Sequence, residues 1–185
     1  MNKKIKALLG VVALVLVIGV AYFAHYNLQH LGQEYIIYIP DNEEQEDLPM
    51  APDILIYDAH GNEVWLSDFL GRPVVLNFWA TWCPSCGHES PHFEALYNEL
   101  GNEIELLKVV LKDGVRETRS RVDMFMQQYN YTFPLFFDTS GQASLAYGVT
   151  HIPRTFFITR EGYVAAHIQG AATEESLMVG VERIK

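Results

Sequence analysis

The sequence predicts an α/β fold in which helices flank a mixed central sheet. From Ile54 to the C-terminus, segments typical of strands alternate with segments typical of helices. One of them, Val74–Ala80, is an apolar run typical of a strand that is buried on both faces. Near the end of the chain, two strand-like segments flank a turn at Glu161-Gly162, so the sheet should also contain an antiparallel hairpin.

The first predicted elements are a strand pair, the buried strand and a long helix. Strand signals at Ile54–Tyr57 and Glu63–Leu66 flank a turn that contains glycine, which predicts that the two strands pair. A helix is expected over Cys86–Leu100, because apolar residues recur at helical spacing and Gly101 follows the last of them. These apolar residues are Phe93, Leu96, Tyr97 and Leu100.

The second half of the region continues the alternation. A strand at Ile104–Leu111 precedes a helix at Glu117–Tyr129, whose apolar residues share one face. A last helix should begin after Thr173, because Thr173 is a favourable cap and two glutamates follow it in the first turn. The elements expected between these two helices are strands at Phe133–Phe137, Thr155–Thr159 and Tyr163–Gln169 and a short helix at Gln142–Tyr147.

Composition excludes two broad classes of protein. The 185 residues include 13 Lys and Arg against 23 Asp and Glu, a net charge of −10, which argues against nucleic-acid binding. Hydrophobic residues make up 49% of the chain and charged residues 19%, so the chain is too apolar to be disordered. Residues 50–185 have the size of one domain, and we expect a monomer.

The N-terminus predicts a membrane anchor. Residues 1–6 form a basic tail with three lysines, and residues 7–24 carry no charge and are long enough to cross a bilayer. The positive-inside rule places the tail in the cytoplasm and the rest of the chain outside, in an oxidising space. A signal peptide is the alternative, because Gly19-Val20-Ala21 resembles a cleavage site. Residues 25–49, with five acids between Asp41 and Asp47, are expected to be a solvated acidic linker.

The two cysteines of the chain, Cys83 and Cys86, are predicted to be reactive. They lie at the junction of the buried strand and the long helix, in the sequence Trp82-Cys83-Pro84-Ser85-Cys86. The unpaired N–H groups and the positive dipole at a helix N-terminus favour a thiolate, which lowers the pKa of the Cys83 thiol. Cys83 is therefore the expected nucleophile, and Cys86 is expected to resolve the mixed disulfide that Cys83 forms.

A zinc site is the alternative reading of this motif, because His88 and His92 follow the two cysteines. Helix geometry disfavours it: His88 lies two residues after Cys86, about 200° around the helix axis. We therefore expect no metal, and no cofactor other than a redox-active Cys83–Cys86 disulfide.

Several motifs in order resemble the TlpA/ResA-like branch of the thioredoxin superfamily, which consists of membrane-tethered thiol:disulfide oxidoreductases. The similar segments are Met50–Asp53, Leu66–Phe69, Leu76–Cys83, Tyr147–Val149 with Ile152-Pro153, and Gly170–Glu175. The resemblance implies a thioredoxin-like fold with a central insertion, which Val115–Pro134 would supply.

The same resemblance implies roles for residues around the dithiol. Pro153 would be a cis-proline facing the sulfurs, and the backbone of Ile152 would pair with an extended client segment. Glu89 aligns with the active-site glutamate of the branch and would relay protons to or from Cys86. Arg154 departs from the small residue usual at its position and would either cap the groove and favour acidic substrates or lie outward. The other residues expected to contact substrate are Trp82, Pro84 and Ser85.

The function implied is reduction of disulfides in exported proteins at a bacterial cell membrane, with one membrane span and the catalytic domain outside. Implied clients include apocytochrome c and methionine sulfoxide reductase, and the implied electron donor is a membrane protein of the CcdA/DsbD type. Two alternatives stay open: a disulfide-forming oxidant, because Pro84 resembles the DsbA site, and a tethered binding module without turnover. A peroxidase is disfavoured, because Ala80 stands where peroxiredoxins carry Thr or Ser.

Overall fold

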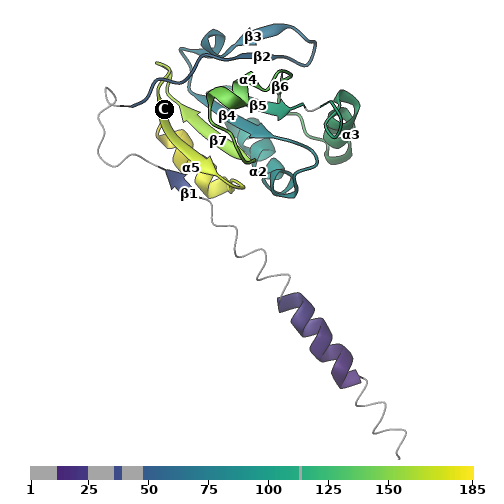
Figure 1. Ribbon diagram of the computed structural model, residues 1–185. Coiled ribbons are helices and arrows are strands. Elements are labelled where there is room, and N and C mark those ends of the chain that lie inside the picture. The colour runs from purple at the N-terminus through teal and green to yellow at the C-terminus, as the bar shows by residue number, and fades with distance from the viewer. Residues whose placement is uncertain (1–11, 25–35, 39–47, 113) are drawn as a thin grey trace, which may run out of the picture. The chain divides into compact units, whose positions relative to one another are not determined.

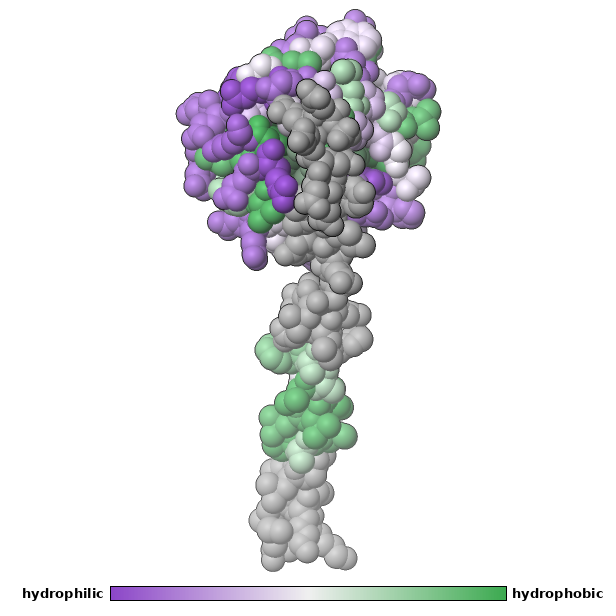
Figure 2. All heavy atoms as spheres, turned by 90° about the vertical axis from the view of Figure 1, so that its left-hand side faces the viewer, coloured by the Kyte–Doolittle hydropathy of each residue, from purple (hydrophilic) through white to green (hydrophobic). Residues whose placement is uncertain are grey.

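The computed structural model describes residues 12–24, 36–38, 48–112 and 114–185, which belong to two compact units, Met1–Glu34 and Tyr35–Lys185. In the first unit, residues 12–24 form a helix whose largely apolar side chains are exposed (Figure 2). Within the described ranges, no helix is both long and apolar enough to cross a membrane. The predicted tail at residues 1–6 and the start of the predicted span lie outside these ranges.

The second unit is built on one mixed sheet of eight strands, in the order β1-β8-β7-β4-β5-β6-β2-β3 (Figure 1). Strands β4, β5 and β6 run parallel to one another, and every other neighbouring pair is antiparallel. The strands are β1 (Ile36–Tyr38), β2 (Leu55–Tyr57), β3 (Glu63–Trp65), β4 (Val74–Trp79), β5 (Glu105–Leu111), β6 (Leu135–Asp138), β7 (Arg154–Ile158) and β8 (Val164–Gln169).

Strand β4 lies in the middle of the sheet, and all six of its residues are buried. Successive side chains point to opposite faces, so that Val75 and Trp79 join one apolar cluster and Leu76 and Phe78 join the other. Burial on both faces explains why the strand is apolar almost without interruption, and the prediction of a buried central strand is confirmed.

Helices cover both faces of the sheet. Phe93 of one long helix and Leu177 of the last helix belong to the cluster on one face, whereas Ala143 belongs to the cluster on the other. The predicted arrangement of helices around a mixed sheet is therefore confirmed. The helices are α2 (Pro84–Leu100), α3 (Arg119–Tyr129), α4 (Gln142–Ala146), α5 (Glu174–Glu182) and the 3₁₀ helix η2 (Leu66–Phe69).

Two helix starts and one additional strand are the main differences from the sequence predictions, and the other ends shift by one or two residues. Helix α2 begins at Pro84 rather than Cys86, because Cys83 itself is the N-cap and proline is well suited to the first helical position. Helix α3 begins at Arg119, because the Thr118 hydroxyl accepts a hydrogen bond from the Arg121 N–H and caps the helix there. The segment expected to be a linker contributes a strand, β1, which pairs with β8 at the edge of the sheet.

Candidate active site: a dithiol at the start of helix α2

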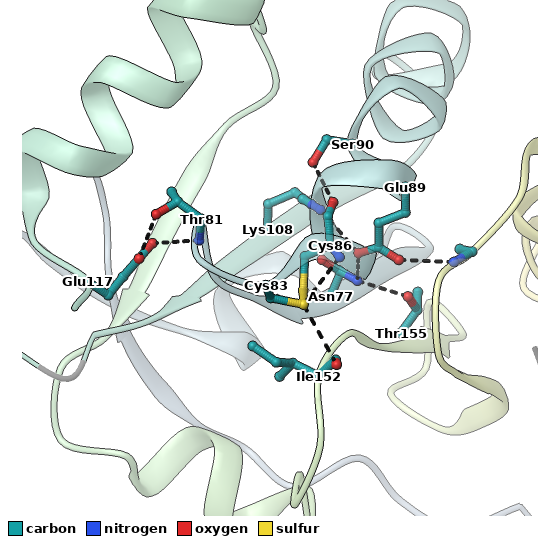
Figure 3. The surroundings of a disulfide bond; sticks show 11 residues. Asn77, Thr81, Cys83, Cys86, Glu89, Ser90, Lys108, Glu117, Ile152 and Thr155 are labelled. Carbon is teal, nitrogen blue, oxygen red and sulfur yellow. Dashed lines mark hydrogen bonds and ion pairs between the residues drawn. A yellow bond between two sulfur atoms is a disulfide. The ribbon is translucent and has the colours of Figure 1, made fainter. Parts of the chain in front are cut away.

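The two cysteines form a disulfide at the point where β4 passes into α2 (Figure 3). Cys83 is the N-cap, and its sulfur accepts a hydrogen bond of 3.2 Å from the backbone N–H of Cys86. Cys83 keeps 6% of its surface exposed, whereas Cys86 keeps none. The N–H groups at the helix start therefore stabilise negative charge on Cys83, which is also the cysteine that a partner reaches first.

The loop before β7 brings Ile152 and Pro153 beside the disulfide. The Ile152–Pro153 peptide bond is cis, as the resemblance implies, and the carbonyl oxygen of Ile152 lies 3.8 Å from the sulfur of Cys83. Ile152 is partly buried against both apolar clusters, which fixes the loop to the core. The structure thus brings together Cys83, Cys86, Ile152 and Pro153, four residues singled out from the sequence.

Glu89 lies one turn after Cys86 and is completely buried. Its carboxylate accepts hydrogen bonds from the Asn77 side chain (2.9 Å) and from the backbone N–H of Ala172 (3.0 Å). The Asn77 amide also donates to the Thr155 hydroxyl (3.0 Å), so that α2, β4, β7 and the loop before α5 meet at this carboxylate. Burial raises the pKa of Glu89, and the nearby Lys108 ammonium only partly opposes that effect.

Lys108 is the buried counter-charge of Glu89, and it was not among the site residues predicted from the sequence. Its ammonium lies 3.5 Å from the Glu89 carboxylate and 4.0 Å from the centre of the Phe93 ring, a cation–π contact. Burial lowers the pKa of Lys108 to about 8, although the negative charge of Glu89 opposes the shift. The available signal was one charged residue in the middle of the apolar strand Glu105–Leu111, because such a charge needs a partner.

Glu117 is a second residue near the site that was not predicted from the sequence. It is buried, and its carboxylate accepts hydrogen bonds from the backbone N–H (2.9 Å) and hydroxyl (2.7 Å) of Thr81 (Figure 3). Thr81 lies two residues before Cys83, so that the insertion between β5 and β6 holds the loop that carries the nucleophile. No local pattern marks Glu117, because its partner is 36 residues away in the chain.

The remaining predicted site residues lie at the rim of the site or away from it. Trp82 is 38% exposed, Pro84 is exposed and Ser85 is half-buried. Arg154 lies on the opposite face of β7 from Thr155, and its guanidinium is 5.4 Å from the centre of the Phe156 ring. His88 is exposed, and the described part of the chain contains no group of three His, Cys, Asp or Glu side chains that could hold a metal.

A thioredoxin-like fold with a disulfide at a helix N-terminus, beside a loop that carries a cis-proline, defines a thiol:disulfide oxidoreductase. The model of the AhpC/TSA family matches residues 49–167. The thiol-disulfide oxidoreductase ResA of Bacillus thuringiensis subsp. konkukian is 34% identical over 185 residues, which covers 98% of this chain and 98% of the relative. The chain belongs to the AhpC/TSA family and, within it, to the ResA-type thiol-disulfide oxidoreductases.

Other relatives agree. ResA of Geobacillus thermodenitrificans is 38% identical over 136 residues, which covers 73% of this chain and 76% of that protein. Among solved structures, StoA from Bacillus subtilis matches with a TM-score of 0.61 and 26% identity, covering 71% of this chain and 98% of its own. The lipoprotein thioredoxin Etrx1 of Streptococcus pneumoniae matches with a TM-score of 0.62 and 26% identity, covering 71% and 98% of the two chains.

Proposed function

We propose that the protein is a reductant of disulfides in exported proteins, held at the outer face of a bacterial cell membrane. The observation that carries the proposal is the unequal exposure of the two cysteines at the start of α2. Cys83 reaches the surface beside Ile152, whereas Cys86 is fully buried next to the turn that carries Glu89. One cysteine is thereby available to a client, and the other is reserved for the second step.

In the first step, the thiolate of Cys83 attacks one sulfur of the client disulfide. A bond forms between Cys83 and that sulfur, the client S–S bond breaks, and the second client sulfur leaves as a thiolate that takes up a proton. The client is held as an extended segment against the backbone at Ile152, with Trp82, Pro84 and Ser85 forming the adjacent surface. The helix start stabilises the attacking charge on Cys83 before the client arrives.

In the second step, Cys86 displaces the client. The Cys86 thiol passes its proton to the Glu89 carboxylate, and the resulting thiolate attacks the sulfur of Cys83. The Cys83–Cys86 disulfide forms, and the first client sulfur leaves as a thiolate and is protonated. Two electrons have then moved from the protein to the client. Burial of Glu89 suits it to this role, because a raised pKa makes its carboxylate a better proton acceptor near neutral pH.

Residues 7–24 are proposed to anchor the protein in the membrane. The three lysines before this apolar segment support a cytoplasmic N-terminus, and the acids that follow it suit a solvated tether. An oxidising compartment returns free dithiols to disulfides, so that a reductant there needs a dithiol donor that draws electrons across the membrane. A donor of the CcdA/DsbD type would meet this need, and apocytochrome c and methionine sulfoxide reductase are suitable clients.

Turnover of a disulfide-containing peptide by the wild-type protein and by Cys83→Ser tests the activity. We expect the substitution to abolish turnover, and equal activity in the two proteins would refute the assignment.

The reduction potential measured against glutathione tests the direction of electron flow. A value near ~−270 mV supports a reductant, and a value near ~−120 mV would instead make the protein a disulfide-forming oxidant.

A further inference from the structure

Positive charge is concentrated in one stretch of the insertion, residues 112–121, here called the basic segment. Of the thirteen Lys and Arg in the chain, three precede residue 7 and four lie in these ten residues. The four are Lys112, Arg116, Arg119 and Arg121, and all four side chains are exposed. Arg119 forms an ion pair of 2.8 Å with Asp123, two residues beyond the segment. The two acids of the segment are Asp113, which is outside the described ranges, and Glu117, which is buried against Thr81.

The basic segment touches the loop that carries the nucleophile. The guanidinium of Arg116 lies 4.1 Å from the centre of the Trp82 ring, and the next residue, Glu117, bonds Thr81. Arg121 donates a hydrogen bond of 2.9 Å to the carbonyl of Arg116, which holds the segment in place. Two consecutive residues of the insertion therefore contact the two residues that directly precede Cys83.

We propose that Arg116, supported by the other cations of the basic segment, selects clients that carry an acidic side chain beside the cysteine that is attacked. The inference rests on the proposed function and adds a specificity determinant to it. Arg116 and Trp82 are both exposed, so that a client bound at Cys83 passes over them. A guanidinium recognises a carboxylate through paired N–H donors, and a stacked arginine is already oriented for such contact.

Charge complementarity favours an acidic client segment over other occupants. The chain after residue 24 carries ten basic and 23 acidic residues, so that most of its surface repels an acidic protein. A positive patch beside the dithiol steers such a client to the reactive cysteine in one orientation. An anionic membrane surface would attract the same cations. However, the contact of Arg116 with Trp82 places the positive charge of Arg116 where the client disulfide must approach.

The test uses the reduced full-length protein in phosphatidylcholine vesicles and three disulfide peptides. The peptides differ only in the residue beside the attacked cysteine, which is Asp, Ser or Lys. We expect the Asp peptide to be reduced about 3- to 10-fold faster than the Lys peptide at low salt, and the ratio to approach one at high salt. Arg116→Gln should shrink the ratio and Arg116→Glu should invert it, whereas the rate with the Ser peptide reports on folding.

Arg160→Glu is the matched control, because it makes the same charge change at the turn between β7 and β8. It should keep the preference of the wild type. Equal wild-type rates for all three peptides would overturn this inference and leave the proposed function standing, whereas reduction of none of them would overturn both. Loss of the preference when phosphatidylglycerol is added to the vesicles would show that the segment faces the membrane, and would also overturn the inference.

Discussion

Glu89 and Lys108 form a buried pair of opposite charges behind the dithiol. Both are fully buried, and their charged atoms lie 3.5 Å apart. Burial favours the neutral form of each group, which raises the pKa of Glu89 and lowers that of Lys108. A carboxyl and an amine whose pKa values are brought toward each other exchange protons readily, which suits a proton relay to Cys86.

The relay predicts that Glu89→Gln slows the second step of the reaction. An amide cannot accept the Cys86 proton, so that resolution of the mixed disulfide should slow by about 100-fold. In the wild type, the rate of resolution should rise with pH as Glu89 ionises, at a pH above that at which a glutamate ordinarily ionises. The variant should lack this rise. Single-turnover kinetics between pH 4 and 9 measure both effects. Glu99→Gln, a surface change on the same helix, serves as the control, and an identical profile in the Glu89 variant would rule out the relay.

The substitution Lys108→Met tests whether burial of the Lys108 amine lowers the free energy of unfolding. The pKa of Lys108 falls from 10.5 to about 8 on folding, so the folded protein binds this proton less tightly than the unfolded chain. The resulting cost is fully present below about pH 8 and disappears as pH rises toward 10.5. The variant should therefore be more stable than the wild type in acid, where Glu89 is protonated and needs no counter-charge, and this gain should shrink as pH rises.

Denaturant unfolding at a series of pH values measures this difference. Lys112→Met, the same change on an exposed side chain, should leave the free energy of unfolding almost unchanged at every pH. If the stability of the Lys108 variant relative to the wild type does not vary with pH, folding does not disfavour the charged form of the Lys108 amine.

Some residues of the site could be predicted from the sequence, and others could not. Cys83 and Cys86 were predicted from their place at the junction of a strand and a helix, and Glu89 and Pro153 from the resemblance to the TlpA/ResA-like branch. Lys108 and Glu117 were not, because their roles arise from contacts across the sheet and from the insertion. Arg154 was expected either to contact substrate or to lie outward; the alternation of side chains along β7 places it on the opposite face of the strand from Thr155, and its contact with substrate stays a prediction.

At the scale of elements, helix α5 docks on the sheet through a close approach that only glycine permits. A Cβ atom at Gly180 would lie 2.2 Å from the ring of Phe157 in β7. Leu177 and Val181, on either side of Gly180 in the chain, are buried in the same cluster. The loop before this helix supplies the Ala172 N–H that binds Glu89, so that the docking of α5 bears on the site.

Gly180→Ala should therefore destabilise the protein by about 1–3 kcal/mol through overpacking, despite the higher helix propensity of alanine. Gly87→Ala makes the same change in α2, where a Cβ atom meets nothing within 4 Å, and should stabilise by up to about 1 kcal/mol. Thermal and urea unfolding of the two variants compare them. Equal effects of the two substitutions would mean that α5 does not pack as closely as described.

Most elements were predictable, because their hydrophobic periods are clear and glycine, proline or threonine marks many of their ends. Strand β1 was not predicted, since an edge strand of three residues is too short to show a period. Its pairing with β8 depends on backbone hydrogen bonds rather than on a side-chain pattern. The starts of α2 and α3 were displaced by two residues, because the capping side chain decides where each helix begins.

At the scale of the whole molecule, the proposed role requires that the catalytic unit stay at a membrane. A single arginine placed in the apolar segment, as in Val15→Arg, opposes insertion by about 2.5–3.5 kcal/mol. We expect the wild-type protein to sediment with membranes and the variant to do so much less, as cell fractionation and immunoblotting would show. Val15→Leu is the matched control. Release of the wild-type protein as a shortened chain would indicate a cleaved signal peptide instead.

The most direct measurement traps the reaction between its two steps. Reduced Cys86→Ser is mixed with a disulfide-containing peptide, and the products are analysed by mass spectrometry without added reductant. The account predicts a stable adduct of one peptide per chain, joined through Cys83, because no second thiol is present to displace it. Absence of an adduct, or formation of an equal amount of adduct through Cys86 in the Cys83→Ser protein, would contradict the assignment of Cys83 as the nucleophile.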